Sequence, residues 1–154
     1  MQGSEENKVA HKIIVVDDSP TQLTAFTIEL KLAGFEVVGV SNGRLALETL
    51  DKGGFELAII DLMMPDMNGL ELARKIRERH PVVKTMLMSG YVLSPIQLAK
   101  VDVGVIGFIP KPHSHDELVA FIHERIDSTD TEDRDLAILG GPFSSKQDAP
   151  PVAV

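Results

Sequence analysis

The chain has 154 residues, of which 44% are hydrophobic and 25% are charged, and its net charge is −8. This length and composition are typical of one globular domain. The negative charge argues against bulk attraction to nucleic acid or to anionic lipid. The sequence contains no cysteine, which excludes disulfides and thiol chemistry.

The sequence also lacks the usual signals of export. No apolar run approaches the roughly 18 residues that are needed to span a bilayer. The first ten residues are polar and acidic and do not resemble a signal peptide. We therefore expect a cytoplasmic protein with no membrane insertion.

Five short apolar segments alternate with helix-length segments along the chain. They are rich in β-branched residues and do not alternate cleanly, which favours strands that are covered on both faces. These segments are residues 12–16, 36–40, 56–60, 84–88 and 105–109.

Capping signals mark the helices between these segments. Ser19-Pro20 is typical of an N-cap followed by proline at the first helical position, and Gly34 predicts the end of that helix. Four more helices are predicted after Ser41-Asn42, around residues 70–76, after Ser94-Pro95 and after Ser114, where the spacing is that of a capping box.

Five successive strand–helix units predict a parallel sheet with helices on both faces, because parallel neighbours need crossover connections. The expected fold is α/β, a doubly wound five-stranded parallel sheet with five helices. We expect this domain at residues 11–127, after a polar arm (1–10) and before a mobile acidic, Pro- and Gly-rich tail (128–154). The apolar run at 136–139 is either a chance cluster or short helix packed on the domain, or a docking peptide for a partner.

Polar residues stand where four of the predicted strands end. Because ligand sites in open parallel sheets form at the carboxyl ends of the strands, these residues should meet at one edge. Each could be an ordinary turn or capping residue, but independent turns give no reason for complementary charges to gather there. The residues are Asp17-Asp18, Asp61, Ser89-Gly90 and Pro110-Lys111-Pro112.

This set of side chains points to phosphoryl transfer. Three clustered carboxylates repel one another, and a hard divalent cation with oxygen ligands, such as Mg²⁺, relieves that repulsion. A cation, the Lys111 ammonium and the Ser89 hydroxyl are groups that hold a phosphoryl group. Asp61 is central among the strand ends and is the predicted nucleophile.

Four segments together resemble the receiver domain of bacterial two-component response regulators, and the resemblance covers residues 11–127. It implies the flavodoxin-like receiver fold and a phosphorylation-dependent signalling switch. The segments are "VVDDS" (15–19), "IIDLMMPDMNG" (59–69), "MSG" (88–90) and "FIPKP" (108–112).

The resemblance implies a role for each matched acidic residue. Asp61 would accept a phosphoryl group from a phosphohistidine. Asp18 and Asp61 would bind Mg²⁺ directly, with Asp17 acting through water and the backbone carbonyl of Met63 as a further ligand.

The resemblance also implies the groups that surround the phosphoryl group. Lys111 would pair with its oxygens, and Ser89 would turn inward to hydrogen-bond it together with the Gly90 amide. Phe108 matches the switch aromatic of the family. The Lys111-Pro112 peptide bond would be cis, as is usual at this position of the family.

One stretch departs from the family pattern. His113 and His115 replace the usual apolar residue after Lys-Pro. They are interpreted as exposed capping residues, with a pair of metal ligands as the alternative.

The partners implied are a sensor histidine kinase or histidine phosphotransfer protein as donor, and a downstream protein or a second copy of the chain as reader. The chain would be a stand-alone receiver or one excised from a larger regulator or hybrid kinase. It would catalyse only its own phosphorylation and dephosphorylation at Asp61. No direct nucleic-acid contact is expected, because the 27 residues after Asp127 are acidic and too few for a DNA-binding domain.

Two other functions remain as alternatives. A haloacid-dehalogenase-like phosphatase also uses an aspartate nucleophile and Mg²⁺, but its D-x-D pattern after the first strand is replaced here by an adjacent pair. A receiver that acts as an interaction module without phosphorylation is the second alternative.

Overall fold

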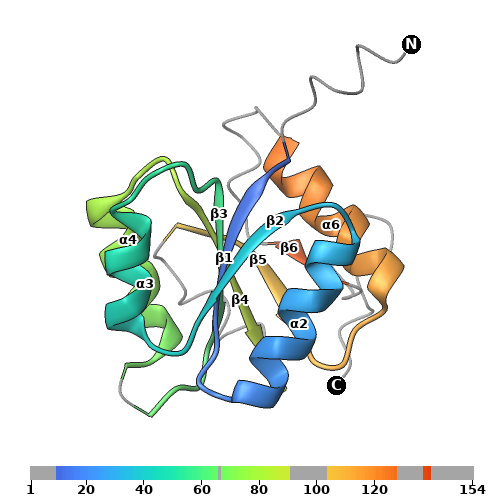
Figure 1. Cartoon of the computed structure of the whole chain (residues 1–154), viewed down its shortest axis with the longest axis horizontal. Helices are drawn as coiled ribbons and strands as arrows, with labels where there is room; N and C mark the ends of the chain where they lie inside the picture. Colours follow the sequence, from blue (N-terminus) through green and yellow to red (C-terminus); the bar gives the residue numbers. More distant parts are fainter. Residues whose placement is uncertain (1–9, 66, 91–103, 128–136, 140–154) are drawn as a thin grey trace, which may run out of the picture.

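The computed structural model describes residues 10–65, 67–90, 104–127 and 137–139, which form one six-stranded sheet flanked by helices (Figure 1). The strand order is β2-β1-β3-β4-β5-β6, and every adjacent pair is parallel. The strands are β1 (Lys12–Val16), β2 (Glu36–Val40), β3 (Leu57–Asp61), β4 (Lys84–Ser89), β5 (Val105–Pro110) and β6 (Ala137–Ile138).

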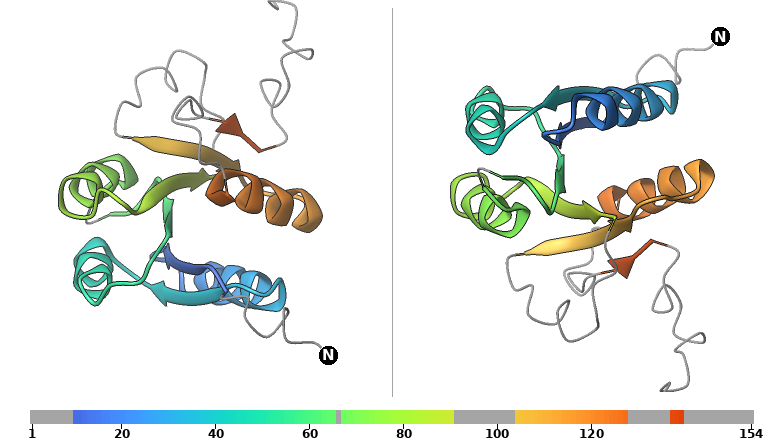
Figure 2. Two further views of the ribbon diagram at one scale, coloured as in Figure 1. Left: turned by 90° about the horizontal axis from the view of Figure 1, so that it is seen from above. Right: turned by 90° about the horizontal axis from the view of Figure 1, so that it is seen from below.

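Four helices within the described residues cover the two faces of the sheet. They are α2 (Pro20–Leu32), α3 (Gly43–Leu50), α4 (Gly69–Arg79) and α6 (His115–Asp127). Figure 2 shows α2 and α6 on one face and α3 and α4 on the other. This arrangement confirms the predicted doubly wound α/β fold. The predicted fourth helix, after Ser94-Pro95, lies outside the described residues.

Each strand from β1 to β5 contributes side chains to two separate cores, because successive side chains point to opposite faces. In β1, Ile13 packs with α2 and α6, whereas Ile14 packs with α3 and α4. Both residues are fully buried. This is why the strands read as unbroken apolar runs in the sequence. No helix among the described residues is both long enough and apolar enough to cross a membrane.

Side chains cap the starts of four helices, and at α6 the Ser114 hydroxyl accepts a hydrogen bond from the Glu117 N–H at 3.5 Å. Ser19, Asn42 and Asn68 each accept a hydrogen bond from the backbone N–H three residues later, at 3.4, 2.9 and 2.8 Å. Such a cap satisfies one of the free N–H groups of the first turn. The caps therefore hold the strand-to-helix connections, where the acidic residues lie.

The apolar run at 136–139 contributes the strand β6, so the alternative of a short helix at this place is wrong. Ala137 pairs with Gly107, Ile138 pairs with Phe108, and the N–H of Leu139 donates to the Phe108 carbonyl at 2.9 Å. A four-residue apolar run has no periodicity that separates helix from strand. The exposed edge of β5 offers unpaired backbone groups, so a strand is the conformation that satisfies them. The sheet consequently has six strands rather than the predicted five.

Replacing Leu139 by alanine is expected to lower the free energy of unfolding by about 2 kcal/mol, because this side chain packs in the core beside α6. Leu32→Ala is the matched control, since Leu32 is 82% exposed. Its effect should stay within about 0.5 kcal/mol. Urea unfolding followed by circular dichroism measures both. Equal, small effects would contradict the packing of β6.

Candidate functional site

The predicted site residues gather at the carboxyl edge of the sheet. Asp17 directly follows β1, Asp61 and Ser89 are the last residues of β3 and β4, and Lys111 directly follows β5. The order of the strands reverses between β1 and β3, where open parallel sheets form ligand sites. The sheet thus delivers these side chains from four separate strands to one place.

Three carboxylates form the centre of the site. Asp17, Asp18 and Asp61 each place an oxygen within 4.8 Å of the other two. Asp17 is 1% exposed, and its position is fixed because its Oδ1 accepts a hydrogen bond from the Ser19 N–H at 2.9 Å. Asp18 is exposed, so the cluster is open to solvent on one side. Such a set of hard oxygen ligands, with room for water, fits Mg²⁺.

Asp61 is a buried carboxylate that has both a cation and other carboxylates as neighbours. Its Oδ1 accepts a hydrogen bond from the Met63 N–H at 3.3 Å and lies 3.9 Å from the Lys111 Nζ. Burial raises the pKa of the Asp61 carboxyl above its ordinary value. The Lys111 ammonium and the Met63 N–H oppose this rise, and the Asp17 carboxylate adds to it. The Met63 side chain points away from the core and is 59% exposed.

Lys111 is held at several points. Its Nζ lies 3.4 Å from Asp17 Oδ2 and donates a hydrogen bond of 2.7 Å to Gln22 Oε1. Its backbone N–H donates to the Ser89 carbonyl at 2.9 Å. The Lys111-Pro112 peptide bond is cis, as expected from the resemblance. Gln22 was not predicted from the sequence, because only the folded structure brings its side chain to Lys111.

The helix that follows β3 lies unusually close to Asp61. A Cβ atom added at Gly69 would lie 2.7 Å from the Asp61 carbonyl oxygen and 2.8 Å from the Leu62 Cα. The Gly69 N–H also donates to the Leu62 carbonyl at 2.9 Å. Glycine is therefore required at the start of α4, because any side chain would push the helix away from the backbone that carries Asp61.

Ser89 and Phe108 lie on the same face of the sheet, which α3 and α4 cover. Phe108 is buried and pairs across strands with Leu87, and both side chains belong to the same core. Ser89 follows Leu87 by two residues and is 1% exposed, so strand alternation places its side chain on the same face. Gly90 has open space around the position of a Cβ atom.

His113 and His115 both bind Glu29 of α2. The ring nitrogens lie 3.1 Å (His113 Nε2) and 2.9 Å (His115 Nδ1) from its carboxylate oxygens. His115 is exposed, as predicted, but the His113 side chain is only 13% exposed and packs edge-to-face on Phe26. The interpretation of His113 as an exposed cap is therefore wrong, because Glu29 and Phe26 draw its ring against α2.

The alternative of a metal site at His113 and His115 is not supported by the geometry. In the described part of the chain, two clusters place three metal-binding side chains within 4.8 Å of one another. One is the acidic cluster above, and the other contains His11, His123 and Asp127. The His113–His115 pair belongs to neither.

The family model of the response regulator receiver domain matches residues 13–123. The chain belongs to this family. Its receiver domain is similar to the DNA-binding response regulator MtrA of Mycolicibacterium smegmatis, with 30% identity over 129 residues. That alignment covers 84% of this chain and 56% of MtrA, so the chain spans about half the length of this curated relative.

Solved receiver domains share the fold. One from Methanospirillum hungatei is 28% identical with a TM-score of 0.71, covering 77% of this chain and 95% of that chain. The response regulator TrrA of Thermotoga maritima, solved in complex with Mg²⁺-BeF, is 30% identical with a TM-score of 0.67. The match covers 75% of this chain and 98% of TrrA. The family match argues against the phosphatase alternative, since the matched relatives are regulators.

Replacing Asp61 by asparagine is expected to raise the free energy of unfolding at neutral pH in metal-free buffer. In the wild type the unfolded chain loses the Asp61 proton at the ordinary pKa and the folded chain loses it at a higher pKa. The folded state therefore binds more protons between these two values, and stability falls as the pH rises through that window.

The advantage of Asp61→Asn should shrink as the pH is lowered toward the ordinary aspartate pKa of about 3.9. Urea titrations of both proteins at a series of pH values measure this difference. An advantage that does not change with pH would contradict the proposed cost of burying the charge.

Proposed function

We propose that this receiver domain is a phosphorylation-dependent switch in which Asp61 accepts a phosphoryl group from a sensor histidine kinase or a histidine phosphotransfer protein. The observation that carries the proposal is the setting of the Asp61 carboxylate. Asp17 and Asp18 each place a carboxylate oxygen within 4.8 Å of it, and the Lys111 ammonium lies 3.9 Å from its Oδ1. An acidic ion site and a fixed cation around one nucleophilic oxygen are the requirements of phosphoryl transfer.

The transfer exchanges one bond to phosphorus for another. An Asp61 oxygen forms the new O–P bond as the P–N bond of the phosphohistidine breaks, and the electron pair of that bond returns to the imidazole nitrogen. Lys111, already held by Asp17 and Gln22, lies close enough to pair with the phosphoryl oxygens.

The acidic cluster is proposed as the Mg²⁺ site, with Asp18 and Asp61 as direct ligands, Asp17 through water and the Met63 carbonyl as a further ligand. When bound, Mg²⁺ would neutralise negative charge on the phosphoryl oxygens. The complex of the relative TrrA with Mg²⁺-BeF supports this assignment.

Phosphorylation adds negative charge beside Lys111 and Ser89. We assign the Ser89 hydroxyl and the Gly90 amide as donors to the phosphoryl group. Movement of Ser89 toward Asp61 would change the packing next to Phe108, which lies on the same face of the sheet. The surface around β5 and α6 would then have two conformations, and phosphorylation would shift the equilibrium between them.

A downstream protein, or a second copy of the chain, would read this surface by binding one state more tightly. β6 pairs with β5 at the edge of the sheet, so residues 137–139 would form part of the same surface. The complete set of Asp17, Asp18, Asp61 and Lys111 argues against a receiver that acts without phosphorylation. The proposal holds equally for a stand-alone receiver and for one within a larger regulator or hybrid kinase.

Incubation with Mg²⁺ and acetyl phosphate is expected to add one acid-labile phosphoryl group, measured by intact mass. Asp61→Asn should abolish this addition. Asp116→Asn is the matched control, because Asp116 is an exposed aspartate in the first turn of α6, and it should be labelled like the wild type. Labelling that persists in Asp61→Asn would contradict the assignment of the nucleophile.

Replacing Lys111 by alanine is expected to uncouple phosphorylation from the rest of the domain. In the wild type, phosphorylation should shift the backbone amide resonances of β5, and at equal phosphorylation these shifts should largely disappear in Lys111→Ala. Lys75→Ala is the control, since Lys75 is exposed on α4. Full β5 shifts in Lys111→Ala would show that this ammonium does not transmit the signal.

A further inference from the structure

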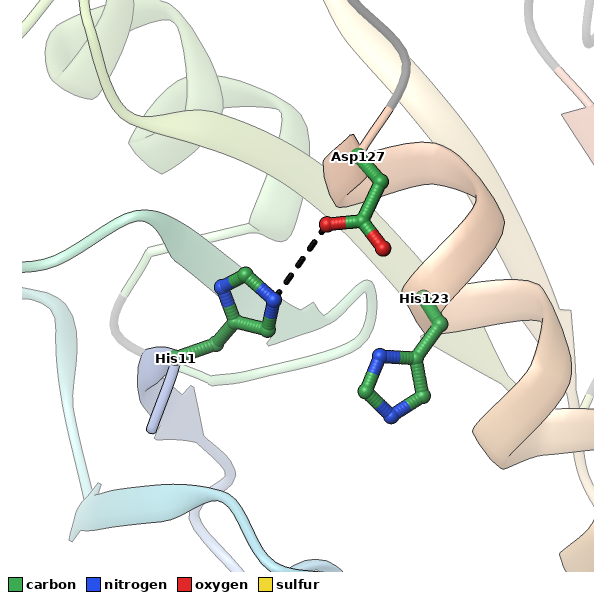
Figure 3. A group of neighbouring side chains, drawn as sticks. All are labelled: His11, His123 and Asp127. Carbon is green, nitrogen blue, oxygen red and sulfur yellow. Dashed lines mark ion pairs between the residues drawn. The ribbon is translucent and has the colours of Figure 1, made fainter. Parts of the chain in front are cut away.

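A second cluster of ligand-type side chains lies at the other end of the sheet, where the strands begin. His11 precedes β1, and His123 and Asp127 come from the last turns of α6. Figure 3 shows the three side chains converging, with one ligand atom of each within 4.8 Å of the other two. His123 and Asp127 are four residues apart, so the helix places them on one face.

The His11 ring is held in one orientation by a carboxylate. Its Nδ1 lies 2.9 and 3.1 Å from the two oxygens of Glu56, and one of these oxygens also accepts the Lys12 N–H at 3.3 Å. Nε2 is then directed at Asp127, with 3.3 Å between Nε2 and Oδ1. A carboxylate on the far nitrogen is the usual support of a metal-binding histidine, because it fixes the ring and raises its basicity.

The end of α6 is fixed as well. Lys84, at the start of β4, donates from its Nζ to the carbonyls of Arg125 at 3.0 Å and Ile126 at 2.8 Å. The His123 ring packs on Phe35 with 4.9 Å between ring centroids. The His11 ring and the backbone at the end of α6 are therefore held in place without any ion, whereas the side chains of His123 and Asp127 can rotate.

We propose that His11, His123 and Asp127 bind a transition-metal ion of the Zn²⁺ class, with Glu56 positioning His11. Tetrahedral zinc with bonds of about 2.0–2.1 Å separates its ligand atoms by roughly 3.3–3.4 Å. The His11 Nε2 and Asp127 Oδ1 already stand at 3.3 Å. The remaining gaps close by rotation of His123 and Asp127, which are exposed, and water fills the fourth position.

The charge and the donor types favour this ion over others. Asp127 and Glu56 supply two carboxylates around the proposed divalent ion. The nearby Lys84 ammonium donates to backbone carbonyls of α6. Imidazole nitrogens suit Zn²⁺, Co²⁺ and Ni²⁺, whereas Mg²⁺ prefers oxygen ligands. The two ends of the sheet therefore select different ions. The bound ion would join the start of β1 to the end of α6.

Calorimetric titration of the full chain with Zn²⁺, in excess Mg²⁺ to occupy the acidic cluster, tests this site. One equivalent should bind, and His123→Gln or Asp127→Asn should weaken binding by about tenfold or more. Glu56→Gln, which leaves all three ligands in place, should weaken it by about tenfold. His115→Gln, an exposed histidine on the same helix, should bind as the wild type does.

Co²⁺ provides a second readout that needs no phosphorylation. It should give the visible absorption of a tetrahedral centre in the wild type and lose it in His123→Gln. The proposal is overturned if Zn²⁺ does not bind, because His11 then serves only as an ion-pair partner of Glu56 and Asp127. It is also overturned if binding survives His123→Gln and Asp127→Asn but is lost in Asp61→Asn.

Discussion

The carboxylate of Asp61 lies at the end of a strand that is otherwise apolar, and the free energy of burying its charge constrains everything around it. Burial and the nearby Asp17 raise its pKa, while Lys111 and the Met63 N–H lower it. The opposing groups come from separate strands, so the balance exists only when the sheet is assembled. The folded domain thus holds one carboxylate whose charge is costly to bury, and the proposed divalent ion would reduce that cost.

The surrounding backbone is arranged to keep that carboxylate in place. Gly69 lets α4 begin in contact with the Asp61 carbonyl, and the caps at Ser19 and Asn68 hold the adjoining connections. Lys111 is held from two sides, by the backbone of β4 and by Gln22 of α2. The site is therefore preorganised by elements that also build the two cores.

Helix α6 links the two ends of the sheet. It begins at His115, which together with His113 binds Glu29, and it ends at the cluster of His11, His123 and Asp127. The end near Lys111 lies close to hard oxygen ligands, whereas the far end carries imidazole nitrogens. An ion at the far end would stiffen the helix whose surface is proposed to change on phosphorylation.

The fold and the acidic site could be predicted because their signals are local. The buried parallel strands are continuous apolar runs, and Asp17, Asp18, Asp61 and Lys111 stand where those runs end. Gln22 carries no such signal, since a polar residue on the first turn of a helix is ordinary. The run at 136–139 is too short for its periodicity to decide between helix and strand. His11 and Asp127 are far apart in the sequence, and only the tertiary packing of β1 against α6 brings them together.

A crystal structure of the chain grown with Mg²⁺ and beryllium fluoride, which mimics a phosphoryl group, tests most directly whether Asp61 is the phosphoryl acceptor. We expect beryllium bonded to an Asp61 oxygen, Mg²⁺ among Asp17, Asp18 and Asp61, and Lys111 Nζ in contact with a fluorine. Beryllium bonded to another carboxylate, or Lys111 still bound to Gln22 and away from the fluorines, would contradict this expectation.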